Sequence, residues 1–261
     1  MKIRTGTLTE LKQQGKKFAC LTSYDQQTAE IFDQSGIEVL LVGDSASNTI
    51  LANDGTIPIT LDEMIVFGRA VARSARSALV VLDLPFGSYE ESAEQALRNS
   101  IRAMKETGVA AVKIEGPRTE QIRTLVSNGI PVMGHIGFTP QTVHALSGYK
   151  VQGRDQDGER LLEEAKAIEA AGAFAIVLEM VPAELAKRIT AQISIPTIGI
   201  GAGNQTDAQI LVWTDFAGLG SKAPSFAKQY AQLRRNLSDA AMQYSIEVKT
   251  GSFPGPEQSF S

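Results

Sequence analysis

Short apolar runs alternate with amphipathic segments along most of this chain, from Lys17 to about Gly220. Runs such as Val39–Val42 and Leu79–Leu82 have the length and composition of buried strands. The segments between them place apolar residues at helical spacing, as in 159–171, where charged residues lie off the apolar stripe. This alternation predicts repeated βα units that form a parallel sheet.

Capping signals support the predicted helices. Thr60–Glu63 has the sequence of a capping box, and Ser88–Glu91 offers a second one. Thr139-Pro140 and Val181-Pro182 place proline where a helix begins, and Gly172 is a natural stop for the helix before it.

The predicted strands share one further property, because their carboxyl ends run into ionisable or small polar residues. A seventh strand, 196–200, runs into the glycine-rich segment 201–204. In the other six, the last strand residue is followed by a polar one: Thr22 by Asp25, Val42 by Asp44 and Ser45, Leu82 by Asp83, Val112 by Lys113 and Glu115, Met133 by His135, and Leu178 by Glu179. Catalytic groups of a (β/α)8 TIM barrel lie at the carboxyl ends of several strands, so the layout predicts this α/β fold.

A doubly wound open sheet is the alternative fold, since it also binds ligands at the carboxyl ends of its strands. The number of βα units, close to eight, favours closure into a barrel. No change of composition divides the chain, so we expect a single barrel domain over 1–261.

Residues 225–248 have a helical pattern, and 225–261 is expected to form a helical extension with a C-terminal arm that frays or packs on a partner subunit. The irregular stretch 147–158 is either an active-site lid or a surface insertion.

Composition narrows the function classes. The chain has 261 residues and a net charge of -4, without an arginine stripe or a lysine run, so nucleic-acid binding is not expected. The single cysteine, Cys20, lies inside an apolar run and is expected to be a core residue. The N-terminus lacks a signal-peptide pattern and every apolar run is too short to span a bilayer, so we expect a cytoplasmic protein without a membrane partner.

Three of the strand-end carboxylates suggest a metal site. Asp44, Asp83 and Glu115 would form a hard-oxygen site suited to Mg²⁺ if they face one barrel mouth. The alternative is that strand-end aspartates cap the next helix or end a turn. Lys113 and Glu115 point to the same side of a strand, and Lys113 pairs either with a substrate carboxylate or only with Glu115.

Glu179 and His135 are the other candidates. Glu179 ends the most apolar strand, where apolar surroundings would raise its pKa and suit a general base, although it could instead cap the helix after Pro182. His135 could contact a substrate oxygen, or it could be a structural histidine with satisfied partners.

Several longer motifs resemble the ketopantoate hydroxymethyltransferase (3-methyl-2-oxobutanoate hydroxymethyltransferase) family. They occur in the expected order between about residues 17 and 230. The motifs are Leu21–Asp25, Val42–Ser45, Asp83–Phe86, Val112–Gly116, Gly134–Gln141 (GH-x-G-x-TPQ), Gly148–Arg154 (GYKVQGR), Leu178–Pro182 and Ile198–Gly203.

The resemblance implies a fold, an assembly and a reaction. Members are (β/α)8 barrels that form homo-oligomers, typically decamers, and that transfer a hydroxymethyl group from 5,10-methylenetetrahydrofolate to 3-methyl-2-oxobutanoate with Mg²⁺. It implies that Asp44, Asp83 and Glu115 surround the metal and that Glu179 accepts the proton. It also implies that the oxo acid is held by Asp44, Ser45, Asp83 and Lys113, with His135 at or next to the substrate.

Two other functions remain as alternatives. One is a Mg²⁺-dependent carbon–carbon lyase that acts on 2-oxo acids, as in the phosphoenolpyruvate mutase and isocitrate lyase group. Its Lys-Lys-Cys-Gly signature is absent, since the only cysteine is Cys20. The other is a barrel that only binds a metabolite or partner, and such a chain would be expected to have lost Glu179 or a metal carboxylate.

Overall fold

Eight parallel strands form a closed barrel in the computed structural model, which describes residues 2–155 and 157–260. The strands are β1 (Phe18–Thr22), β2 (Val39–Val42), β3 (Leu79–Asp83), β4 (Ala111–Lys113), β5 (Val132–Gly137), β6 (Ala175–Glu179), β7 (Thr197–Ile200) and β8 (Ala208–Leu211). Each strand pairs with the next one along the chain, and β8 pairs with β1. This closure confirms the predicted (β/α)8 TIM barrel and rules out the open sheet.

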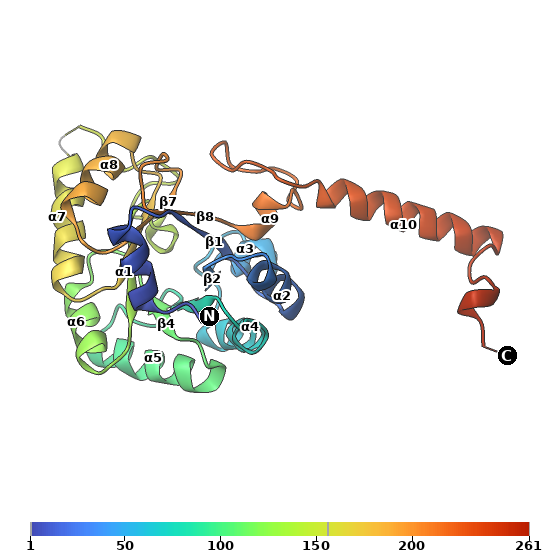
Figure 1. Ribbon diagram of the computed structural model, residues 1–261, viewed down its shortest axis with the longest axis horizontal. Coiled ribbons are helices and arrows are strands. Elements are labelled where there is room, and N and C mark those ends of the chain that lie inside the picture. Colours follow the sequence, from blue (N-terminus) through green and yellow to red (C-terminus); the bar gives the residue numbers. More distant parts are fainter. Residues whose placement is uncertain (1, 156, 261) are drawn as a thin grey trace. The chain divides into compact units, whose positions relative to one another are not determined.

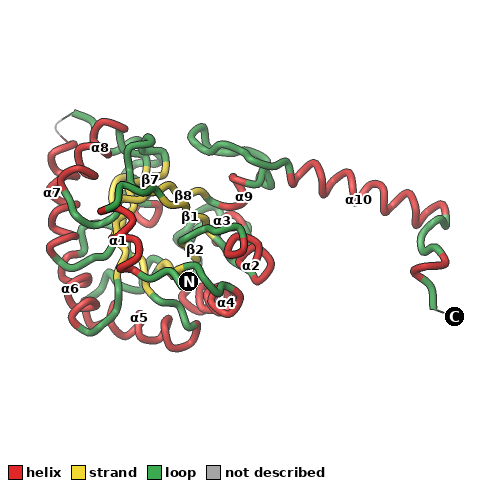
Figure 2. Tube along the Cα trace, viewed as in Figure 1, coloured by secondary structure: helices red, strands yellow, loops and turns green. Residues whose placement is uncertain are grey.

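Helices surround the strands (Figure 1) and form the outer layer in red around the yellow strands in Figure 2. They are α1 (Thr5–Gln13), α2 (Gln26–Gln34), α3 (Ala46–Thr49), α4 (Leu61–Ser74), α5 (Ala93–Thr107), α6 (Thr119–Ser127), the 3-10 turn η1 (Pro140–Thr142), α7 (Asp157–Ala170) and α8 (Ala183–Gln192). Because this layer covers the outside of the barrel, β2 and β3 are buried along their whole length. Burial on both faces explains why the strands appear in the sequence as continuous apolar runs instead of alternating ones.

The helix starts agree with the sequence in part. Thr60 caps α4 in the predicted box with Glu63, and Gly172 has a left-handed φ of +101° just beyond α7. The box predicted at Ser88–Glu91 is wrong, because α5 begins at Ala93 and Ser92 caps it by accepting from the amide of Gln95.

The Ser88 hydroxyl donates instead to the carbonyl of Pro85, and Glu90 accepts from the amide of Gly87 inside the same turn. These local hydrogen bonds satisfy the polar side chains without a helix. Similarly, Pro182 is the N-cap of α8 and not its first helical residue.

The chain divides into two compact units, 1–212 and 213–261, which we describe separately. The second contains α9 (Trp213–Phe216), α10 (Leu233–Thr250) and the 3-10 turn η2 (Pro256–Gln258). The helix predicted over 225–248 begins later, at Leu233, and no residue of α10 is buried. The rings of Phe216 and Tyr230 stack with 5.2 Å between centroids.

No helix in the ranges 2–155 and 157–260 combines the length and the apolar character needed to cross a membrane. Cys20 is buried in β1, as the sequence predicted.

Asp33 links the end of α2 to the segment that enters β3. Its carboxylate accepts from the backbone amides of Arg76 (2.9 Å), Ser77 (2.9 Å) and Ala78 (2.6 Å). Desolvation alone would raise the pKa of Asp33, but the three amides outweigh it and the pKa is lowered.

We expect Asp33→Asn to lower the free energy of unfolding by about 1–2 kcal/mol at pH 7, because hydrogen bonds to a charged acceptor are lost. A carboxyl with a lowered folded-state pKa stabilises the fold above its unfolded pKa, and this contribution disappears as the pH falls through the folded value. Urea unfolding between pH 3 and pH 7 should therefore show a smaller acid destabilisation in the variant. Equal pH slopes in the two proteins would contradict this role.

Gly137, at the end of β5, allows a close approach of β6. Its φ is +96°, and a Cβ there would lie 2.2 Å from the carbonyl oxygen of Glu179 and 2.6 Å from Val181. Gly36 has a similar φ of +84° with no neighbouring atom within 4 Å.

We expect Gly137→Ala to destabilise the protein by about 3–5 kcal/mol, the sum of left-handed strain and backbone displacement. Gly36→Ala is the matched control and should cost only about 1–2 kcal/mol, because strain acts there alone. Urea midpoints of the two variants test the difference, and similar midpoints would show that the strand approach is unimportant.

Candidate active site at the carboxyl end of the barrel

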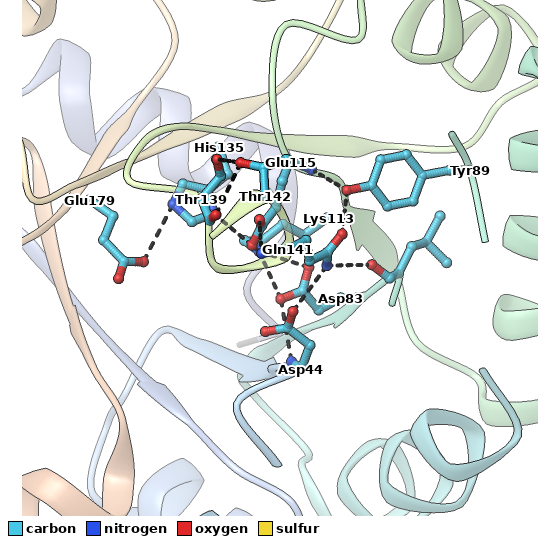
Figure 3. Close-up of polar contacts among 11 residues, drawn as sticks. Asp44, Asp83, Tyr89, Lys113, Glu115, His135, Thr139, Gln141, Thr142 and Glu179 are labelled. Atoms are coloured by element: carbon cyan, nitrogen blue, oxygen red, sulfur yellow. Dashed lines mark hydrogen bonds and ion pairs between the residues drawn. The ribbon is translucent and has the colours of Figure 1, made fainter. Parts of the chain in front are cut away.

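Three buried carboxylates from neighbouring strands meet at one end of the barrel (Figure 3). Asp83 is the last residue of β3, while Asp44 and Glu115 follow the ends of β2 and β4 by two residues. One oxygen atom of each lies within 4.8 Å of the others, and none of the three residues is more than 4% exposed. The structure therefore brings together the set for which the sequence suggested a metal site.

Lys113 supplies a positive charge to this cluster. The strand register pairs Asp83 with Lys113, which sets the two side chains next to each other. The Lys113 Nζ lies 2.7 Å from both oxygens of Asp83 and 3.3 Å from Glu115 Oε1. Burial alone would lower the pKa of Lys113, but the carboxylates around it outweigh burial and raise the pKa, so the amine stays charged.

His135 lies between two carboxylates. Its Nδ1 is 3.2 Å from Glu115 Oε1 and its Nε2 is 3.4 Å from Glu179 Oε2, although neither contact has hydrogen-bond geometry. Burial and the charge of Lys113 lower the pKa of His135, whereas Glu115 and Glu179 raise it to about 9. The imidazolium thus connects Glu179 to the carboxylate cluster.

Glu179 ends β6 and faces the same cavity as the cluster. Its side chain is 17% exposed, so it can reach a molecule bound there. The next residue, Met180, has a left-handed φ of 49°, which turns the chain sharply away from the strand. The carbonyl of Met180 accepts a hydrogen bond from the backbone amide of Gln152. The segment 147–158, predicted as a lid or a surface insertion, is therefore anchored beside Glu179. Gln156, within that segment, lies outside the described residues.

The cavity between these groups has a volume of about 90 Å³. Its polar lining includes Asp44, Ser45, Lys113 and Glu179, and Val177 contributes an apolar wall. The cavity therefore offers both a charged side and an apolar side to a small bound molecule.

Three residues around this cavity escaped the prediction from sequence. The Tyr24 hydroxyl lies 2.7 Å from Ser45 Oγ, Gln141 donates to the Asp44 carboxylate, and the Tyr89 hydroxyl accepts from the backbone amide of Glu115. Tyr24 and Gln141 belong to motifs singled out in the sequence, which was the signal available for them. Tyr89 lies in a segment interpreted as a helix cap, which concealed its role.

The cluster has the chemistry of a site for a divalent cation. Its donors are hard carboxylate oxygens, which Mg²⁺ prefers. Burial, together with the negative charges of Asp83 and Glu115, raises the pKa of Asp44 well above its ordinary value. Burial also raises the pKa of Glu115, but Lys113 and His135 outweigh it and lower that pKa to about 2. The donor set and the excess of negative charge both fit a dication.

The fold is similar to that of known Mg²⁺-containing and lyase structures. Phosphonopyruvate hydrolase in complex with oxalate and Mg²⁺ aligns over 98% of this chain and 93% of its own, with 12% identity and a TM-score of 0.62. The 2,3-dimethylmalate lyase of the phosphoenolpyruvate mutase/isocitrate lyase superfamily aligns over 100% of this chain and 93% of its own, with 17% identity and a TM-score of 0.60. At these identities the similarity concerns the fold alone.

Sequence relatives are much closer. The family model described as ketopantoate hydroxymethyltransferase matches residues 2–256. The 3-methyl-2-oxobutanoate hydroxymethyltransferase of Leifsonia xyli is 56% identical over 99% of this chain and 95% of its own length. The protein of that name from Corynebacterium glutamicum is 54% identical over 99% and 97%. With a family match over nearly the whole chain and full-length relatives above half identity, this protein is an enzyme that belongs to the ketopantoate hydroxymethyltransferase family.

Proposed function

We propose that this protein transfers a hydroxymethyl group from 5,10-methylenetetrahydrofolate to 3-methyl-2-oxobutanoate. The product is 2-dehydropantoate (ketopantoate), and the reaction belongs to pantothenate and coenzyme A biosynthesis. The observation that carries the proposal is Glu179 facing the same cavity as Asp44, Asp83 and Glu115, in a chain of this family. This arrangement suits removal of a proton next to a keto group, the first step of such a transfer.

Glu179 is the proton acceptor in this proposal. Its carboxylate removes the proton from C3 of the oxo acid and leaves an enolate. His135 lies 3.4 Å away and, as a cation, holds the Glu179 carboxylate in one orientation. The nucleophilic C3 then forms a bond to the one-carbon unit of the folate as one of that carbon's two bonds to nitrogen breaks. Water displaces the second nitrogen and supplies the hydroxyl group of the product. Tetrahydrofolate leaves, and its two nitrogens receive the proton taken by Glu179 and the proton released by water.

Ser45 and Lys113 hold the oxo acid together with Asp44 and Asp83. Lys113 offsets the negative charge of the substrate carboxylate and of the enolate. The apolar side chains of Val177 and Ile200 line the cavity and can receive the isopropyl group.

Asp44, Asp83 and Glu115 would hold Mg²⁺ in this site. When bound, the cation supplies Lewis-acid stabilisation of negative charge that develops on the keto oxygen. Two of these carboxylates, Asp83 and Glu115, also contact Lys113, so the ammonium group would add its positive charge to that of the cation.

The remaining features of the proposal concern the whole chain. A cytoplasmic location is supported by the single cysteine, Cys20, which cannot form a disulfide within the chain. The homodecamer implied by the resemblance is supported by the apolar side chains that α10 exposes, among them Leu237, Met242 and Ile246. The organisation as one barrel domain with an extension over 225–261 stays a prediction.

We expect Glu179→Gln to lower turnover by at least about a hundredfold, because the amide cannot accept the C3 proton. Deuterium exchange at C3 of 3-methyl-2-oxobutanoate should fall equally, since it requires no folate, while calorimetry should still detect oxo-acid binding. Glu184→Gln, on the exposed start of α8, is the control and should keep full exchange. Exchange near the wild-type rate in Glu179→Gln would refute the base assignment.

We expect Asp83→Asn to weaken Mg²⁺-dependent binding of the oxo acid by more than about tenfold, because a buried charged oxygen donor is lost. Asp207→Asn is a matched control, since Asp207 also pairs with a lysine, Lys12 at 2.9 Å, but lies before the amino end of β8. Isothermal titration with and without Mg²⁺ distinguishes the two. Unchanged affinity in Asp83→Asn would overturn the metal assignment.

A further inference from the structure

Gln141 contacts two of the three clustered carboxylates from outside the strands that carry them (Figure 3). It lies in η1, after β5, and is 2% exposed. Its side-chain Nε2 donates to Asp44 Oδ2 at 3.0 Å, and its backbone amide donates to Glu115 Oε2 at 3.1 Å. One residue therefore holds oxygens of carboxylates that come from β2 and β4.

Tyr89 determines which way the amide of Gln141 faces. The Tyr89 hydroxyl accepts from the backbone amide of Glu115 at 3.1 Å and lies 2.5 Å from Gln141 Oε1. A backbone amide can only donate, so the phenolic proton is left for Gln141. The amide oxygen of Gln141 thus faces Tyr89.

The amide nitrogen of Gln141 then faces two acceptors. Besides Asp44, it donates to the backbone carbonyl of Leu84 at 2.9 Å. A carbonyl oxygen has no proton to give, so the reversed amide would place two oxygens in contact. Both ends of the side chain are fixed by their partners, and Asp44 receives a directed hydrogen bond.

We propose that Tyr89 and Gln141 are positioning residues that hold the oxygens of Asp44 and Glu115 in their ion-binding arrangement before a divalent cation binds. Carboxylates this close repel one another, and each could rotate away. Hydrogen bonds donated to their oxygens oppose that rotation. The inference rests on the proposed metal site, and it adds two residues that contact neither the substrate nor the cation.

The experiment measures Mn²⁺ binding to the full-length protein without substrate, by the electron paramagnetic resonance signal of the free ion. Tyr89→Phe removes one hydroxyl, and Gln141→Leu removes the amide at nearly constant size. We expect the Mn²⁺ Kd to rise about 10- to 100-fold in both, the range found when groups that orient metal ligands are lost. Saturating Mg²⁺ should return the kcat of Tyr89→Phe towards the wild-type value.

Tyr24→Phe is the matched control for ion binding. Tyr24 is as buried as Tyr89, but its hydroxyl lies 2.7 Å from Ser45 Oγ, whereas the Tyr89 hydroxyl contacts Gln141 and the backbone amide of Glu115. Because Tyr24 does not contact Gln141, we expect its Mn²⁺ Kd to stay within about twofold of wild type. The melting temperature of each metal-free variant is measured in parallel, because a purely structural role would lower it without changing ion affinity.

The outcomes separate this inference from the function on which it rests. Wild-type protein that binds no Mn²⁺ overturns the metal site and this inference with it. Wild-type binding that Tyr89→Phe and Gln141→Leu leave unchanged overturns only the positioning role. If Gln141→Leu does not fold, the conservative Tyr89→Phe variant decides.

Discussion

The ion pair between Lys113 and Asp83 is the interaction on which the barrel mouth depends. Burying one carboxylate is costly, and burying Asp44, Asp83 and Glu115 within a few ångströms multiplies the cost through mutual repulsion. A buried ammonium group 2.7 Å from both oxygens of Asp83 makes the arrangement tolerable. Lys113 in turn stays charged because these carboxylates surround it, so the groups stabilise one another.

The polar groups of the mouth form one connected set. His135 connects Glu179 to Glu115, Lys113 connects Glu115 to Asp83, and Gln141 connects Glu115 to Asp44. A site of this kind is preorganised, since few of its groups can turn without breaking another contact. Parallel strands contribute to this rigidity, because their hydrogen-bonded register sets neighbouring side chains at fixed spacing.

The fold likeness and the sequence relationship answer different questions. The barrel is shared with lyases and hydrolases at 12–17% identity, where it says nothing about the reaction. The family is established by relatives that are more than half identical over almost the entire chain. The family therefore argues against the lyase alternative considered from the sequence, and the shared fold does not bear on it.

The order of strands and helices could be predicted from the sequence because burial on both faces leaves an unmistakable apolar run, as in Val39–Val42. β8 was not located, since Ala208–Leu211 is short and includes the exposed Gln209.

Asp44, Asp83 and Glu115 were identifiable as strand ends, but only the closed barrel brings them together, because the distances between their side chains depend on the curvature and register of the sheet. Gln141 lies in a motif that the sequence singled out, but the roles of Tyr89 and Gln141 could not be assigned, since their hydrogen bonds join segments 26 to 97 positions apart. Such contacts exist only once the chain has folded.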